Sequence, residues 1–148
     1  MLPIETFKTI VASTPLVSID LVVRNSEGEV LLGQRLNRPA QGYWFVPGGR
    51  ILKGETFDDA FERLTEVELG VEIPLARANF LGAYQHFYED NFSGDDFSTH
   101  YVVLGYELIL DVPLDSLPRL QHGHYRWWHV AELMMSDEVH RHTKWYCA

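Results

Sequence analysis

A short stretch in the middle of the chain most constrains how it can fold. The segment Phe45-Val-Pro-Gly-Gly-Arg50 begins as an apolar strand, predicted over 43–46, and is interrupted by one proline and two glycines. Proline cannot donate a hydrogen bond to a sheet, and glycine adopts backbone angles closed to other residues. A helix is predicted from Thr56 to Leu69, ending at Gly70, because glycine commonly terminates helices. A strand, a glycine turn and a helix in this order can hold a phosphate and a metal ion.

The predicted helix carries an acidic residue on its apolar side. At about 100° per residue the apolar side chains form one stripe, and Glu68 projects within it. The stripe consists of Phe57, Ala60, Phe61, Leu64 and Val67. An unpaired carboxylate against a core is destabilising, so Glu68 needs a cation or strong donors. Two interpretations stay open: an ion pair with Arg63 or Arg50, or a metal ligand. Oxygen ligands near phosphate would select Mg²⁺ or Mn²⁺ rather than zinc.

The spacing of residues in this region resembles the Nudix box, G-x5-E-x7-R-E-U-x-E-E-x-G-U. The matching residues are Gly49, Glu55, Arg63, Glu68 and Gly70. That family hydrolyses nucleoside diphosphates linked to another group. The resemblance implies an α/β fold, specifically a Nudix-type α/β/α sandwich with a mixed β-sheet. It also implies a divalent cation as cofactor, Mg²⁺ or alternatively Mn²⁺.

The match departs from the family pattern at three positions. Leu64 and Val67 stand where the pattern has glutamates, and Thr65 replaces an aliphatic residue. Leu64 lies one helical turn before Glu68 and Val67 lies beside it, so carboxylates at both positions would have clustered with Glu68. We therefore expect fewer metal ions than in an ordinary member, namely one ion per active site.

Three further segments resemble the GDP-mannose mannosyl hydrolases, a divergent branch of this family. They are residues 37–50, 84–94 and 99–105, and the likeness extends over almost the whole chain. It implies Mg²⁺-dependent hydrolysis of GDP-mannose, and also of GDP-glucose, to GDP and the free sugar. Water would attack the anomeric carbon with inversion. The alternatives are an ordinary Nudix diphosphatase that cleaves the P–O bond of a nucleotide sugar, and a non-catalytic module that binds nucleotide sugars.

The same resemblance implies the roles of individual residues. His122 matches the general base, and an ordinary histidine pKa near 6.5 suits proton abstraction near neutral pH. The cation ligands would be Gly48, Glu68 and Gln121. The residues near the sugar and the diphosphate would be Asp20, Arg35, Arg50 and Tyr101. Tyr88 is favoured as a platform for guanine, with Phe7 as a weaker substrate-binding candidate that acts across a dimer interface. Arg63 is expected to support Glu68.

Several of these positions also have simpler interpretations. The cluster Gln121-His-Gly-His124 lacks the cysteine pair or H-E-x-x-H spacing of a zinc site, and such loop histidines are commonly just solvated. Residues 49–56 resemble a phosphate-binding P-loop only faintly, because Glu55 stands where that motif needs lysine. Asp20 is harder to explain, since it interrupts the aliphatic strand predicted over 16–23. A sugar hydroxyl or an arginine would satisfy it.

The remaining pattern predicts a mixed sheet flanked by helices in one domain, residues 1–148, a length that suits a single domain. Strands are predicted over 16–23, 30–35, 79–88, 99–110 and 125–130. Helical segments are predicted over 5–13, 131–135 and 137–146.

Charge and composition bound the possible partners. A net charge of −9 argues against nucleic acid, so local arginines and a cation must attract an anionic nucleotide sugar. The single Cys147 excludes an internal disulfide and fits a reducing compartment. No apolar run approaches the roughly 18 residues of a membrane helix, and Glu5, Lys8 and Asp20 interrupt anything like a signal peptide. We expect a cytoplasmic homodimer that binds a small molecule and neither nucleic acid nor membrane.

Overall fold

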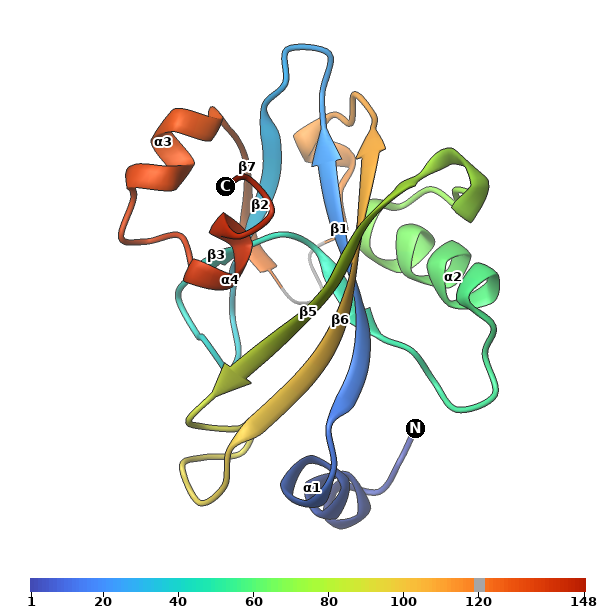
Figure 1. The fold of residues 1–148 in the computed structure, drawn as a ribbon, viewed down its shortest axis with the longest axis vertical. Coiled ribbons are helices and arrows are strands. Elements are labelled where there is room, and N and C mark those ends of the chain that lie inside the picture. Colours follow the sequence, from blue (N-terminus) through green and yellow to red (C-terminus); the bar gives the residue numbers. More distant parts are fainter. Residues whose placement is uncertain (119–121) are drawn as a thin grey trace.

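The computed structural model describes residues 1–118 and 122–148, and within them the chain forms one mixed sheet of seven strands (Figure 1). The strands are β1 (Leu16–Arg24), β2 (Val30–Arg35), β3 (Trp44–Phe45), β4 (Gly48–Arg50), β5 (Asn79–Tyr88), β6 (Thr99–Ile109) and β7 (His122–Trp128). Their order is β3-β2-β1-β6-β5, with β4 also pairing β1 and β7 also pairing β2. β1 and β6 run parallel, and the other pairs are antiparallel.

Helices cover both faces of this sheet. They are α1 (Ile4–Ser13), α2 (Phe57–Leu69), α3 (Val130–Met135) and α4 (Arg141–Lys144), with short 3₁₀ turns at Leu75–Arg77 and Leu114–Ser116. α2 lies on one side of the sheet, while α3 and α4 lie on the other (Figure 1). This arrangement confirms the predicted α/β/α sandwich with a mixed sheet.

The predicted boundaries of α2 are confirmed, but its buried side is turned from the expected stripe. The Thr56 hydroxyl accepts a hydrogen bond from the Asp59 backbone N–H, and Gly70 ends the helix in the left-handed conformation with φ of 78°. Phe57 and Val67 are 55% and 36% exposed. The buried residues are Ala60, Phe61, Leu64, Thr65, Glu68 and Leu69. Glu68 therefore lies within the buried face, as predicted.

Strand β1 contributes to a hydrophobic core on each side of the sheet. Successive side chains of a strand point to opposite faces. Ile19 and Leu21 pack with the α2 residue Phe61 on one face. Val22 packs with Trp128 on the other face. The same alternation assigns Asp20 to the face of Val22, the one covered by α3 and α4.

The two glycines after Pro47 do not form the expected turn. Gly48 and Gly49 belong to β4, which pairs with β1. Neither has a positive φ, so a special backbone conformation is not what these positions require. They require space: a Cβ on Gly48 would lie 2.3 Å from the Ile19 carbonyl oxygen, and one on Gly49 would lie 2.6 Å from Leu64 Cδ2.

The C-terminal region differs from the prediction in two places. The last strand spans His122–Trp128 instead of 125–130, and its first residue pairs with Arg35 of β2. The helix expected over 137–146 is reduced to the four residues of α4. The reason is that the preceding segment runs along β3: Trp44 donates to the Glu138 carbonyl, and its own carbonyl accepts from His140.

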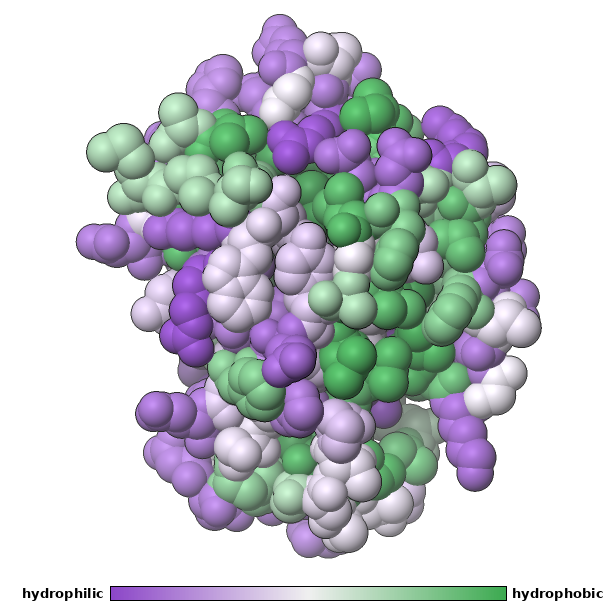
Figure 2. Space-filling view, viewed as in Figure 1, coloured by the Kyte–Doolittle hydropathy of each residue, from purple (hydrophilic) through white to green (hydrophobic). Residues whose placement is uncertain are grey.

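The edge strand β5 carries exposed apolar side chains. Phe80, Leu81 and Phe87 are 58%, 36% and 50% exposed. Hydrophobic residues gather over the upper part of β5 and toward α2 in the space-filling view (Figure 2). Among the described residues, no helix is both long and apolar enough to cross a membrane.

The close approach of β4 to β1 predicts a large effect of a single methyl group. Gly48→Ala should lower the free energy of unfolding by about 3 kcal/mol, the upper end of the range for overpacking, because the Ile19 carbonyl belongs to a paired strand and cannot rotate away. Urea denaturation measures this. Gly54→Ala is the control: Gly54 has φ of +89° but open space around it, so only about 1 kcal/mol of backbone strain is expected. Equal losses would contradict the close contact.

Candidate active site

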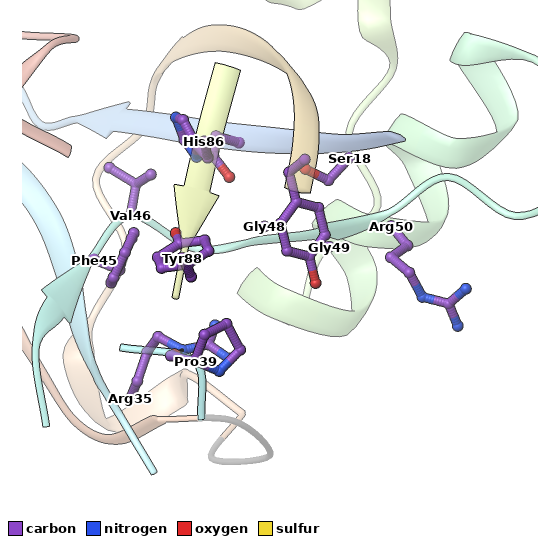
Figure 3. A pocket seen from close by; sticks show the side chains of 12 residues that line it. Ser18, Arg35, Pro39, Phe45, Val46, Gly48, Gly49, Arg50, His86 and Tyr88 are labelled. Atoms are coloured by element: carbon purple, nitrogen blue, oxygen red, sulfur yellow. Dashed lines mark hydrogen bonds between the residues drawn. The ribbon is translucent and has the colours of Figure 1, made fainter. Parts of the chain in front are cut away.

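A cavity of about 220 Å³ opens where β1, β4, β5 and β6 meet (Figure 3). It brings together most of the predicted site residues from distant parts of the sequence. Its lining consists of Ser18, Asp20, Arg35, Pro39, Phe45, Val46, Gly48, Gly49, Arg50, His86, Tyr88 and Tyr101. Glu68 is not part of this lining, and Gln121 lies outside the described residues. For His122 only the backbone is described, and it lies opposite Arg35 in the β2–β7 ladder.

The two arginines of the cavity are each held by a second contact. The Nε of Arg35 donates to the Pro39 carbonyl at 3.0 Å. The guanidinium of Arg50 lies 4.6 Å from the ring centre of Phe7, within the range of a cation–π contact. Figure 3 shows Arg35 near Pro39 on one side and Arg50 extending to the other. Two oriented guanidiniums separated in this way can bind different parts of a diphosphate.

Phe7 reaches the site from α1 of the same chain. Its ring packs against Phe92 at 4.8 Å and beneath the guanidinium of Arg50. Phe7 also lines a cavity beside the first one, together with Arg35 and Tyr101. Its role as a substrate-binding residue, or as a contact across a dimer interface, stays a prediction.

Asp20 has a partner that the sequence did not indicate. The hydroxyl of Tyr146, near the C-terminal end, donates to Asp20 Oδ2 at 2.6 Å. Burial raises the pKa of Asp20 to about 7, although the Tyr146 hydrogen bond and the charge of Arg35 oppose this shift. Asp20 therefore changes charge near neutral pH when the cavity contains no cation.

Glu68 is 2% exposed and lies against the backbone of β4. Its Oε1 accepts a hydrogen bond from the Gly48 N–H at 3.2 Å. Burial raises the pKa of Glu68 to about 7, while the Gly48 hydrogen bond and the charge of Arg35 lower it.

The expected support of Glu68 by Arg63 is wrong. Arg63 forms an ion pair with Glu55 at 2.8 Å, and it also donates to the Arg50 carbonyl. Within the described residues, neither Arg63 nor Arg50 forms an ion pair with Glu68. The helix therefore presents a buried carboxylate that a cation would stabilise.

Among the described residues, Glu68 is the buried carboxylate that the box helix brings next to β4. The described residues contain no group of three or more His, Cys, Asp or Glu side chains placed to bind a metal ion. Leu64 is buried in the core beside Gly49, so it keeps that side of Glu68 apolar. Glu68 is the acidic ligand candidate, since its buried carboxylate lies against Gly48 at the edge of the cavity.

Histidines that the sequence analysis did not single out form a wall of stacked rings beside the site. Of these, His86 lines the first cavity and His140 lines a neighbouring one. The rings of His86 and His142 stack at 4.2 Å, and His140 lies 4.4 Å from His142. Burial lowers the pKa of His86 and of His140 to about 4 and that of His142 to about 2, so the wall is neutral near pH 7. Within the described residues, the buried His86 Nε2 and His142 Nδ1 have no hydrogen-bond partner.

The sequence contains a local pattern that could have indicated His86, but none for His140 and His142. His86 lies two residues before Tyr88 on β5, so the period of two in a strand assigns both to one face. It also pairs with Tyr101 across the β5–β6 ladder. His140 and His142 come from the C-terminal segment, where no such pattern indicates the site.

Tyr88 lies between the first cavity and a neighbouring one of about 460 Å³. This second cavity is lined by Arg38, Ala40, Gln41, Tyr43, Phe87, Tyr88, Glu89, Asp90, His140 and Arg141. Arg38 forms ion pairs with Asp90 at 3.1 Å and with Asp95 at 2.6 Å. An aromatic ring at this boundary can stack with a flat group that extends from the first cavity into the second.

The chain belongs to the Nudix family. Its sequence matches the NUDIX domain model over residues 14–148, which includes the box helix and the cavity described above. Members of this family generally hydrolyse nucleotide derivatives with the help of divalent metal ions such as Mg²⁺.

A curated relative and two solved structures show how far the likeness extends. The low-salt glycan biosynthesis protein Agl8 of Haloferax volcanii is 47% identical over 111 residues, covering 74% of this chain and 69% of Agl8. The MutT NUDIX hydrolase of Burkholderia pseudomallei is 22% identical with a TM-score of 0.70, covering 91% of this chain and 97% of that one. The NUDIX domain of Shewanella oneidensis NrtR, solved with ADP ribose, is 20% identical with a TM-score of 0.64, covering 99% and 95%. These two structures establish the fold.

The raised pKa of Glu68 predicts that neutralising it stabilises the metal-free protein. A group whose pKa is raised on folding is fully stabilising below its unfolded pKa, near 4.5, and loses this contribution as pH rises through about 7. Glu68→Gln keeps the acceptor for Gly48 and removes the buried charge. In metal-free buffer at pH 8 it should raise the free energy of unfolding by about 2–3 kcal/mol, since one pKa unit corresponds to about 1.4 kcal/mol.

The pH dependence and a matched variant test this assignment. By pH 5 the difference between Glu68→Gln and the natural sequence should shrink below about 1 kcal/mol, because Glu68 is then protonated in the folded protein. Glu66→Gln on the exposed side of the same helix should change little at either pH. A Glu68→Gln effect independent of pH would show that burial of the charge is not its cause.

Proposed function

We propose that the protein hydrolyses GDP-mannose, and also GDP-glucose, to GDP and the free sugar. Residues 1–148 form one catalytic domain in this proposal. Water attacks the anomeric carbon and inverts its configuration, as in a single-displacement glycosidase. The observation that carries this proposal is the composition of the cavity. It combines two oriented arginines with Asp20, whereas the box helix brings one buried carboxylate, Glu68, to its edge.

The cavity offers separate groups for the parts of such a substrate. Arg35, Arg50 and Tyr101 provide donors and positive charge for a diphosphate. Asp20 and His86, which both line the cavity, provide polar atoms for sugar hydroxyls. Tyr88 provides an aromatic surface for the base at the boundary with the second cavity. The Agl8 relative is described as a glycan biosynthesis protein, a context in which nucleotide sugars are reactants.

His122 is the general base in this mechanism. It removes a proton from water while the water oxygen bonds to the anomeric carbon and the bond to the GDP oxygen breaks. Its backbone lies opposite Arg35, so base and diphosphate-binding residues come from neighbouring strands. The neutral imidazoles of His86 and His140 do not add charge to this step.

The arginines stabilise the charge that GDP gains as it leaves. Glu68, the Gly48 carbonyl and Gln121 would hold one Mg²⁺ or Mn²⁺, which supplies positive charge to the departing diphosphate. A metal-activated attack on phosphorus would call for more carboxylates on the box helix. Leu64 and Val67 do not provide them.

The remaining parts of the proposal concern assembly and setting. We propose a cytoplasmic homodimer that acts on a small molecule and binds neither nucleic acid nor membrane. The exposed apolar side chains of β5 offer a surface for the second copy.

Hydrolysis in ¹⁸O-labelled water tests the point of attack. Attack at carbon should place the label in mannose and leave GDP unlabelled, because the carbon–oxygen bond of the sugar is broken. From the α-linked substrate the β-anomer should appear first. Mass spectrometry and proton NMR of the products measure both results.

The rival functions give different products. A diphosphatase would release GMP and mannose 1-phosphate, with label in one of the phosphates. A binding module would bind GDP-mannose without turnover. Label in GDP, GMP or mannose 1-phosphate would refute attack at carbon even if GDP-mannose is the substrate.

Substitution of His122 tests the base. His122→Gln should lower turnover by about 10²–10⁴-fold, the usual contribution of a general base, and should remove the acidic limb of the pH–rate profile. His124→Gln is the matched control, since the exposed His124 lies two residues further along β7. If the two variants exchanged their effects, the base would be His124.

A further inference from the structure

Tyr146 approaches the site from the segment after α4. Its side chain is 8% exposed, and its hydroxyl donates to Asp20 Oδ2 at 2.6 Å although the two residues are 126 positions apart. A short hydrogen bond to a carboxylate fixes both partners more firmly than one between neutral groups. Neither the Nudix box nor any neighbouring pattern points to this tyrosine.

The sheet provides a specific place for the Tyr146 ring. Gly105 of β6 lies directly beside Asp20 in the parallel β1–β6 ladder. A Cβ on Gly105 would lie 2.7 Å from Tyr146 Cε1, so the absence of a side chain there lets the ring lie against the strand. Tyr84 of β5 meets the ring edge-on at 4.7 Å. The ring is therefore confined from two strands, and its hydroxyl is aimed at Asp20.

The two oxygens of Asp20 then have different neighbours. Tyr146 holds Oδ2, while Oδ1 lies on the side of Gly48, 2.7 Å from the point that a Cβ there would occupy. Asp20 and Gly48 both line the cavity. The tyrosine thus sets the rotation of the carboxylate about its Cβ–Cγ bond and determines which oxygen a bound molecule can reach.

Attachment of the C-terminal segment does not depend on this hydrogen bond. The Thr143 hydroxyl accepts from the Val46 N–H at 3.3 Å, and the His140 N–H donates to the Trp44 carbonyl. Loss of the Tyr146 hydroxyl alone leaves these contacts and the packing of the ring in place. A positioning role can therefore be separated from a structural one.

We propose that Tyr146 is a positioning residue that orients Asp20 toward the glycosyl group of the substrate. This inference rests on the proposed function, in which Asp20 binds a sugar hydroxyl. GDP alone lacks that group, so its binding should not depend on Tyr146.

A double-mutant cycle tests the proposal. Tyr146→Phe should lower kcat/KM for GDP-mannose by about 10–100-fold, the range for a lost hydrogen bond to a charged group. In an Asp20→Asn background the same substitution should change kcat/KM less than about twofold, because its target is already altered. Affinity for GDP, measured by calorimetry, should change less than about twofold as well. Tyr84→Phe, which removes a hydroxyl from the adjoining ring, is the control and should keep normal activity.

Two outcomes would overturn the proposal. If Tyr146→Phe has the same effect with and without Asp20→Asn, or weakens GDP equally, the tyrosine acts on the fold and not through Asp20. A crystal structure of Tyr146→Phe tests the proposal without any substrate. The Asp20 carboxylate should be rotated relative to its orientation in the natural protein. An unchanged Asp20 conformer would refute the positioning role. Failure of the protein to turn over GDP-mannose would refute the proposed function instead, and the rotation of Asp20 would still decide the role of Tyr146.

Discussion

The contact between β4 and β1 determines the geometry of the whole site. Gly48 lies so close to the Ile19 carbonyl that no side chain fits between the strands. This closeness places the Gly48 N–H within reach of Glu68 on α2 and puts Asp20 of β1 directly opposite Gly48. Glu68 of α2 and Asp20 of β1 therefore approach the same short backbone segment of β4 from different sides.

The alternation of β1 links this contact to the rest of the molecule. Ile19 and Leu21 are fixed in the core beneath α2, so Asp20 between them must face the other side of the sheet. A shift of one residue in the strand would turn Asp20 toward α2 and turn Ile19 and Leu21 toward the face of the cavity. The register that builds the core is thus also the register that presents the carboxylate to the cavity and to Tyr146.

Local sequence patterns predicted those elements whose ends and buried faces are determined by nearby residues. The α2 helix, with its Thr56 cap and Gly70 end, follows from residues within one segment, and so does the burial of Glu68. The contacts that surround Asp20 and Glu68 do not follow from residues within one segment. Arg63 of α2 pairs with Glu55 of the preceding loop. Tyr146 and His142 come from a C-terminal segment whose predicted helix is shortened by pairing with β3. Contacts made by folding distant segments together leave no periodic trace in the sequence.

The packing of Leu64 against Gly49 has a consequence for any redesign of this site. An acidic residue at position 64, as in the usual box, would have to leave the core or place a second carboxylate beside the first within an apolar layer. One substitution therefore cannot add a carboxylate at position 64 without disturbing the interface between α2 and β4. A second acidic ligand on this helix would become possible only after the surrounding apolar layer is redesigned.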